Sequence, residues 1–206
     1  MRLFAAIRPP AEVLDHLELP LTNLRLGAGA PLRWVPVDQQ HVTVAFYGEV
    51  PDGAVGDVAD SLAEAAARHA PLDLRLRGGG SFSGRILWVG VGGETARLTV
   101  LMADAADAPY VRPPDPEDQD DDEPGAPARG NGRGRQERRR AHLTVARESR
   151  RSRGTDMAGL ASALAVYEGP TWRADAVELV SSRLGEGPAG GPLHQVQAVI
   201  PLAGPA

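Results

Sequence analysis

The feature that most constrains this chain is a tetrapeptide that occurs twice, as His-Val-Thr-Val at 41–44 and His-Leu-Thr-Val at 142–145. The chain holds only five His and seven Thr, so two chance copies of this pattern are improbable. Strict alternation of this kind predicts a β-strand, in which residues i and i+2 point to the same face. Each His and its Thr therefore face one way, and the two apolar residues face the other way.

The side chains on that face suit a phosphate group. A His and a Thr two residues apart on a strand are separated by about 7 Å. His can carry a proton near neutral pH, and the Thr hydroxyl can donate a hydrogen bond. Two facing strands would therefore form one pocket in which His41 and His142 supply an acid and a base, while Thr43 and Thr144 supply two donors.

Composition excludes several kinds of chemistry. The chain has no Cys and no Lys, and all 22 of its basic residues are Arg. Thiolate nucleophiles, Cys-ligated zinc, Schiff bases, P-loop lysines and a lysyl-AMP intermediate are therefore excluded. No third His or acid stands at ligand spacing near either motif, so we expect no metal, and we expect no other cofactor. A Ser-His-Asp triad has no nucleophile-elbow motif to support it.

Length and hydrophobicity indicate a globular protein. The chain has 206 residues, 42% of them apolar, which is enough for one domain with a real core. No apolar run approaches the roughly 18 residues of a membrane span. We therefore expect a monomer in the cytoplasm, without a membrane partner.

A charged stretch at about 113–140 interrupts this pattern. Seven acids between Asp115 and Glu123 are followed by six Arg up to Arg140. Low hydrophobicity with dense charge predicts a disordered insertion, and we favour a solvated insertion over an RNA-binding arm. The whole chain, 1–206, is otherwise expected to form a single bilobal domain.

The remaining sequence mixes strands and helices. We expect strands at 3–8, 41–47 with a lead-in at 34–37, 72–77, 86–91, 142–146, 174–181 and 195–200, and helices at 12–26, 55–69, 95–106 and 155–166. Pro20 is expected to end or kink the first helix, and the glycines at 78–80 to break the third strand. The fold class is therefore α+β, with two pseudo-symmetric lobes and a central cleft.

These motifs resemble those of the 2H phosphoesterase superfamily, and within it the 2′-5′ RNA ligase-like RNA 2′,3′-cyclic phosphodiesterases. The similarity covers most of the chain outside 113–140. It includes the opening MRLFAAI, the RWVP at 33–36, both His motifs, and the segments FSGR at 82–85 and WVGV at 88–91. The aromatic and Pro that usually precede the second motif are replaced here by Arg139, Arg140 and Ala141.

The resemblance implies two lobes of antiparallel sheet with outer helices, and hydrolysis of a terminal 2′,3′-cyclic phosphate on RNA ends or nucleotides to a 2′-phosphomonoester. It implies His41 as general acid and His142 as general base, with Thr43 and Thr144 binding the phosphate. Arg147 is a candidate for binding the phosphate or a neighbouring nucleotide, or a solvated loop Arg. The alternatives are 2′-5′ RNA ligation at the same site and a non-catalytic RNA- or nucleotide-binding module.

Other residues are expected to be structural. His16, His69 and His194 lack a Thr two residues further on, so we expect them to be structural or exposed. Trp34 and Phe82 could stack on a base, but core packing is the favoured interpretation for both.

Overall fold

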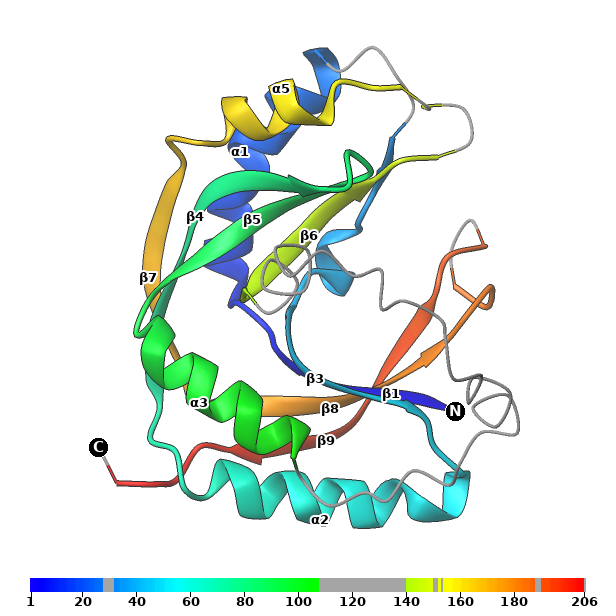
Figure 1. The fold of residues 1–206 in the computed structure, drawn as a ribbon, viewed down its shortest axis with the longest axis vertical. Helices are drawn as coiled ribbons and strands as arrows, with labels where there is room; N and C mark the ends of the chain where they lie inside the picture. Colours follow the sequence, from blue (N-terminus) through cyan, green and yellow to red (C-terminus); the bar gives the residue numbers. More distant parts are fainter. Residues whose placement is uncertain (28–31, 108–139, 150–151, 153, 188–189, 206) are drawn as a thin grey trace, which may run out of the picture.

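One curled antiparallel sheet with helices outside it forms the protein (Figure 1). The computed structural model describes residues 1–27, 32–107, 140–149, 152, 154–187 and 190–205. Strand order is β7-β4-β5-β6-β3-β1-β8-β9, and β2 pairs with β6 off this path. The strands are β1 (Arg2–Ile7), β2 (Arg33–Trp34), β3 (Val42–Glu49), β4 (Leu72–Phe82), β5 (Ile86–Gly93), β6 (His142–Arg147), β7 (Glu168–Ala174), β8 (Ala176–Arg183) and β9 (Leu193–Pro201). The helices are α1 (Ala11–Gly27), α2 (Val55–Ala66), α3 (Thr95–Ala106) and α5 (Met157–Ala163), with 3-10 turns η1 (Val37–Gln39) and η2 (Asp52–Ala54).

Two lobes of this sheet meet between β3 and β6, and each carries two helices. Helix α3 packs on β3 and α2 on β9, whereas α5 packs on β4 and α1 on β7 (Figure 1). The predicted α+β fold of two antiparallel lobes with outer helices is confirmed. The lobes are interleaved along the chain, because β1 belongs to one lobe and α1, which follows it, packs on the other.

The two faces of the sheet differ in what covers them. On β1, Leu3, Ala5 and Ile7 join the main core under the helices. Phe4 and Ala6 point to the opposite side, where they form a separate small buried cluster with Val180 of β8. This second side, the concave side of the curled sheet, is called the inner face below.

The glycine run that follows Arg77 was expected to break the strand. Strand β4 continues through it to Phe82, so the expected break is wrong. A Cβ on Gly79 would lie 2.5 Å from Leu164 Cβ, and one on Gly80 would lie 2.1 Å from the Trp88 ring. Glycine at these positions lets the end of α5 and an indole approach the strand backbone.

Smaller differences concern helix ends and one strand. Helix α1 runs through Pro20 to Gly27, so Pro20 does not end it. Helix α5 is shorter than the expected 155–166, and β7 was not expected at all. The expected insertion at 113–140 lies outside the described residues except for Arg140. No helix in the described ranges is long and apolar enough to cross a membrane.

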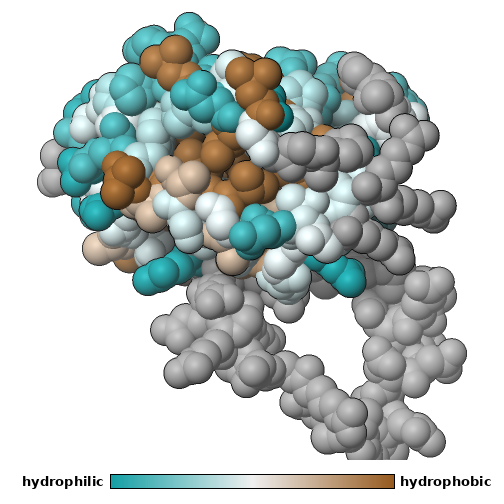
Figure 2. All heavy atoms as spheres, turned by 90° about the horizontal axis from the view of Figure 1, so that it is seen from above, coloured by the Kyte–Doolittle hydropathy of each residue, from teal (hydrophilic) through white to brown (hydrophobic). Residues whose placement is uncertain are grey.

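Figure 2 views the molecule from the α1 and α5 end, where hydrophobic side chains gather near the middle of the face and hydrophilic ones surround them. Helix α1 carries two exposed apolar residues, Leu19 and Leu26. Both lie on the outer side of the molecule, whereas the two His motifs lie on the inner face.

Candidate active site

The two His motifs meet at the centre of the sheet. Strands β3 and β6 pair through Val42 and Leu143, whose side chains are fully buried in the core. Opposite residues of an antiparallel pair point to the same face, and successive residues along a strand alternate between faces. Because Val42 and Leu143 point into the core, the residues before and after each of them point to the inner face. By this register His41 stands opposite Thr144, and Thr43 opposite His142. The predicted set of two imidazoles and two hydroxyls is therefore brought together on one surface.

Both imidazoles are oriented in the same way. His41 Nδ1 lies 2.7 Å from the Gln39 carbonyl oxygen, and His142 Nδ1 lies 2.7 Å from the Arg140 carbonyl oxygen. A carbonyl oxygen only accepts, so each Nδ1 carries the hydrogen and donates it. Each Nε2 is then left without its hydrogen in the neutral ring, available to bind or receive a proton.

Aromatic rings fix the planes of the two imidazoles. Phe4 stacks on His41 at 4.8 Å between ring centroids, and His194 meets His41 edge-on at 5.5 Å. On the other lobe, Phe82 meets His142 edge-on at 4.8 Å. Trp88 also lies against His142, at 6.1 Å. Each imidazole therefore rests against two rings supplied by its own lobe.

Burial and positive charge lower the pKa of both imidazoles. For His41, burial is the largest cause, with His194, Arg8 and Arg147 adding to it, and its pKa falls to about 4. For His142, burial again dominates and Arg147 adds to it, so its pKa also falls below the usual range. Both rings are therefore neutral near pH 7, and a bound anion would raise the pKa of each.

A β-bulge follows each motif and turns one more side chain to the inner face. On β3 the pairing with β1 shifts after Thr43, so that Val44 and Ala45 are both buried and Phe46 pairs with Phe4. Phe46 is 65% exposed. Without the bulge, a residue three places after Thr43 would point into the core.

A β-bulge also follows the motif on β6. Its pairing with β5 shifts after Thr144, so that Val145 and Ala146 are both buried and Arg147 pairs with Ile86. The two strands thus present His-x-Thr-x-x-Phe and His-x-Thr-x-x-Arg to the same face. One lobe adds an aromatic ring to the site and the other adds a guanidinium.

Arg147 stands in a locally cationic position. Arg33 of β2 is directly opposite it, and burial together with the charge of Arg33 lowers the pKa of Arg147 below its usual value. Within the described ranges no carboxylate pairs with Arg147. Two like charges placed opposite each other are destabilising unless an anion lies between or beside them. Arg147 is exposed on the inner face opposite Arg33, so an anion can reach both guanidinium groups.

The two Thr hydroxyls are half-buried and have no hydrogen-bond partner among the described residues. They can therefore donate to a ligand placed between the lobes. The described part of the chain contains no group of three or more His, Cys, Asp or Glu that could hold a metal ion.

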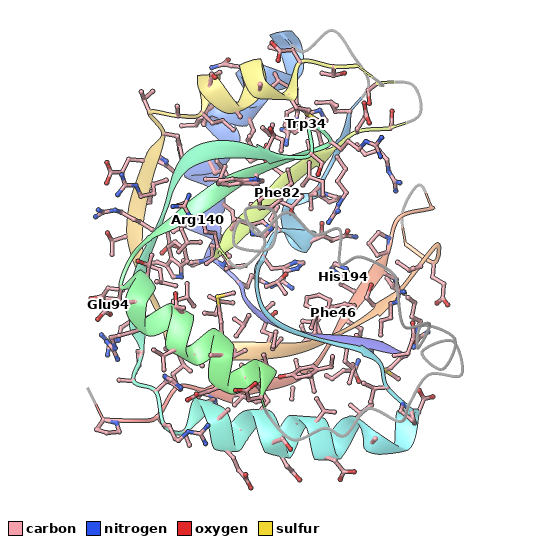
Figure 3. All side chains as sticks on the ribbon, viewed as in Figure 1. Trp34, Phe46, Phe82, Glu94, Arg140 and His194 are labelled. Atoms are coloured by element: carbon pink, nitrogen blue, oxygen red, sulfur yellow. The ribbon has the colours of Figure 1, made fainter. Side chains whose placement is uncertain are left out.

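Several side chains differ from their expected surroundings. His194 was expected to be structural or exposed, but it lies beside His41 and Phe4 on the inner face. Figure 3 shows His194 and Phe46 on the lobe of His41, and Phe82 on the other lobe. Phe82 packs on His142, whereas Trp34 lies under the Arg25 guanidinium at 5.0 Å. His16 and His69 contact Tyr167 and Asp104, away from the two motifs.

The two His-x-Thr strands meet at the centre of a bilobal antiparallel sheet, and these strands carry the resemblance to 2H phosphoesterases. The family model described as LigT like Phosphoesterase matches residues 7–88. Over these residues the chain is similar to the LigT-like phosphoesterases.

Curated relatives are similar to part of the chain. An RNA 2′,3′-cyclic phosphodiesterase from Geobacillus stearothermophilus is 39% identical over 87 residues, which is 40% of this chain and 27% of that protein. One of the same name from Aeropyrum pernix is 34% identical over 74 residues, which is 34% of this chain and 41% of that protein. In these alignments the chain spans less than half the length of either relative.

Solved structures share the fold over nearly the whole chain. A protein from Thermus thermophilus superposes with a TM-score of 0.62 at 24% identity and covers 99% of both chains. E. coli LigT in complex with phosphate superposes with a TM-score of 0.58 at 19% identity, covering 97% of this chain and 96% of LigT. The described residues after 88, which the family model does not reach, therefore belong to the same shared fold.

Proposed function

We propose that this protein hydrolyses terminal 2′,3′-cyclic phosphates of RNA or nucleosides to 2′-phosphomonoesters by two-histidine acid–base catalysis. The observation that carries the proposal is the matched pair of imidazoles on one face with two Thr hydroxyls, each imidazole holding Nδ1–H on a carbonyl and leaving Nε2 for a ligand. The names of the relatives from Geobacillus and Aeropyrum support the same activity.

The reaction follows from this geometry. A water oxygen bonds to phosphorus as the bond from phosphorus to the ribose 3′ oxygen breaks on the opposite side. His142 accepts the proton of the water through Nε2, and His41 gives its proton to the departing 3′ oxygen. The product keeps the phosphate on the 2′ oxygen and carries a free 3′ hydroxyl.

Thr43, Thr144 and Arg147 bind the phosphate in this proposal. The two hydroxyls donate to the non-bridging oxygens as negative charge builds there, and the guanidinium adds positive charge beside them. No metal is needed, because imidazoles move both protons. A bound phosphate anion also raises the low pKa of His41, which lets it carry the proton that it must donate.

The assignment of His41 as acid and His142 as base rests on the family resemblance. A cyclic phosphate with sulfur in place of the 3′ oxygen tests it, because a thiolate leaves without being protonated. The His41→Ala variant should regain most of its lost rate on this substrate, whereas His142→Ala should not. The opposite result would exchange the two roles.

The activity itself is tested by turnover of a nucleoside 2′,3′-cyclic phosphate, with the 2′- and 3′-phosphate products separated. Release of the 2′-phosphate alone supports the proposal. Absence of turnover with retained nucleotide binding would indicate a binding module, and joining of cleaved RNA ends would indicate the ligation alternative. A monomer in the cytoplasm is part of the proposal, and light scattering checks the monomer.

A further inference from the structure

A third imidazole lies on the inner face beside the proposed acid. His194 of β9 pairs in register with Ser182 of β8, and Ser182 pairs with Arg2 of β1. These three residues share the face of Phe4, which is two residues after Arg2. The ring of His194 lies 5.2 Å from the ring of Phe4 and 5.5 Å from that of His41. Strand β9 is three strands away from β3 in a sheet that curls (Figure 1), and the two imidazoles are nevertheless in contact.

On the other lobe, the rings that lie against the imidazole of His142 are a phenyl ring and an indole. His142 rests against Phe82 and Trp88, and neither of these titrates. His41 rests against Phe4 and His194. A ring that only packed against His41 would not need two nitrogens, so the imidazole adds hydrogen-bonding capacity on this lobe that the other lobe lacks.

Both ring nitrogens of His194 are available to a ligand. Nδ1 of His41 and Nδ1 of His142 are each bound to a carbonyl, whereas neither nitrogen of His194 has a hydrogen-bond partner within the described ranges. The His194 side chain is half-buried. Its nitrogens can therefore form directed hydrogen bonds that water does not fully replace.

The charges around His194 favour a neutral ring. Burial, Arg8 and Arg147 lower its pKa, and Asp38 opposes them. Glu178 of β8 forms an ion pair with Arg8 at 3.2 Å, and His41 faces His194 from β3. A neutral imidazole offers one donor and one acceptor, which suits the hydroxyls of a ribose or the edge of a base better than an anion.

The in-line geometry of the proposed reaction indicates which part of the substrate would lie near the His194 ring. The attacking water and the departing 3′ oxygen lie on opposite sides of phosphorus. With His41 as the acid, the departing oxygen and the ribose that carries it lie on the lobe of His41. Exposed Phe46 and His194 belong to the same lobe (Figure 3).

We propose that His194 is a substrate-binding residue that hydrogen-bonds the terminal nucleoside and so selects nucleoside cyclic phosphates over cyclic phosphates without a nucleoside. This inference rests on the proposed function and on His41 as the acid. It assigns to His194 a contact with the ribose or the base edge and no proton transfer.

The test compares two substrates, a nucleoside 2′,3′-cyclic phosphate and glycerol 1,2-cyclic phosphate, which has no nucleoside. The readout is the ratio of the two kcat/KM values. His194→Phe keeps a ring against His41 but removes both nitrogens, and should lower this ratio by about 3- to 10-fold, as expected for one or two neutral hydrogen bonds. His194→Asn restores a donor and an acceptor, and should recover part of the ratio.

Two variants serve as references. Leu193→Ala alters the neighbouring position of β9, whose side chain points to the other face, and should keep the ratio of the unaltered protein. Phe82→Leu alters the wall of the other lobe. A ratio that falls with Phe82→Leu while His194→Phe leaves it unchanged would place the nucleoside on the other lobe and overturn the inference.

Binding gives a readout that does not depend on turnover. Calorimetry with a nucleoside 2′-phosphate should show weaker binding to His194→Phe than to the unaltered protein, whereas inorganic phosphate should show a smaller change. Equal losses for both ligands would overturn the nucleoside contact. An unaltered protein that turns over neither cyclic phosphate would contradict the proposed function, whereas turnover with a ratio independent of residue 194 contradicts this inference alone.

Discussion

His41 and His142 are held in matching positions, each donating Nδ1–H to the carbonyl oxygen two residues before it, at 2.7 Å in both cases. A backbone carbonyl cannot rotate away as a side chain can, so the tautomer and the ring plane are set by the course of the chain. Both Nε2 atoms are therefore oriented toward the inner face before any ligand binds. The cost of orienting them is already met in folding.

Removing either imidazole should nearly abolish turnover. His41→Ala and His142→Ala are each expected to lower kcat by about 10²- to 10⁴-fold, because each removes one proton-transfer partner. Steady-state kinetics on a nucleoside 2′,3′-cyclic phosphate measures the loss. His16→Ala, which removes an exposed histidine of α1, is the matched control and should keep full activity. Near-normal turnover by either site variant, with circular dichroism of a folded protein, would contradict the two-histidine mechanism.

The Thr hydroxyls should matter less than the imidazoles. Thr43→Val and Thr144→Val keep the shape of the side chain but remove a donor to the charged phosphate. A hydrogen bond to a charged group contributes roughly 1.5–3 kcal/mol, so kcat/KM should fall by about 10- to 100-fold in each variant. Thr99→Val in the exposed part of α3 is the control. A loss equal to that of His142→Ala would show that the hydroxyls take part in proton transfer.

The pH profile should be bell-shaped and displaced toward acid. Activity needs one protonated and one neutral imidazole, and in the free protein the pKa of His41 is about 4 while that of His142 is below its usual value. The optimum of kcat/KM should therefore lie on the acid side of neutrality, whichever ring carries the proton, because the two pKa values belong to the pair. The optimum of kcat should be higher, since bound phosphate raises both pKa values.

The effect of a chelator on the pH profile tests whether the reaction needs a metal ion. EDTA should leave the curve unchanged, because the proposed proton transfers use only imidazoles. Loss of activity in EDTA that a divalent ion restores would contradict the mechanism.

Stability should fall on the acid side of neutrality. The pKa of His41 is about 4 in the folded protein and about 6.5 in the unfolded chain, so the folded state resists protonation. The resulting stabilisation is complete above pH 6.5 and is lost as the pH falls toward 4, by at most about 3 kcal/mol. His41→Gln should flatten the dependence of the unfolding free energy on pH in this window, as measured by urea denaturation. His16→Asn should leave the slope unchanged.

Gly80 should not tolerate a side chain. A Cβ there would lie 2.1 Å from the Trp88 ring, so Gly80→Ala must displace the indole that lies against His142. We expect a loss of about 1–3 kcal/mol in unfolding free energy, as for other overpacked sites, together with reduced kcat. Gly56→Ala in α2, where a Cβ meets nothing within 4 Å, should be neutral or stabilising. A Gly80→Ala protein with unchanged stability would contradict this packing.

The sequence predicted that the two His-x-Thr strands share one face because the signal for it is local. A strand that alternates fixes the faces of His41 and Thr43 without any knowledge of the partner strand. The duplication then implied that the second set would meet the first, and the pairing of Val42 with Leu143 agrees with that expectation.

Longer-range features were missed for identifiable reasons. Strand β7 carries Gly169 and Pro170, which argue against a strand, and it is accommodated because β7 is at the edge of the sheet. Phe46 points to the inner face because of a bulge, and the sequence signals this bulge only by two successive apolar residues after Thr43. His194 has no local motif, since its position in the site depends on how far the sheet curls.

Gln39 forms two hydrogen bonds that link the site to the start of β9. Its carbonyl oxygen holds His41, while its side-chain amide donates to the carbonyl of Pro192 at 3.2 Å, just before β9 begins. The orientation of the His41 ring is thereby coupled to Pro192, which lies 153 residues after Gln39 in the chain. A change in the length of the β8–β9 connection would therefore be transmitted to His41 and leave His142 untouched, so the evolution of that hairpin can retune one half of the site independently of the other.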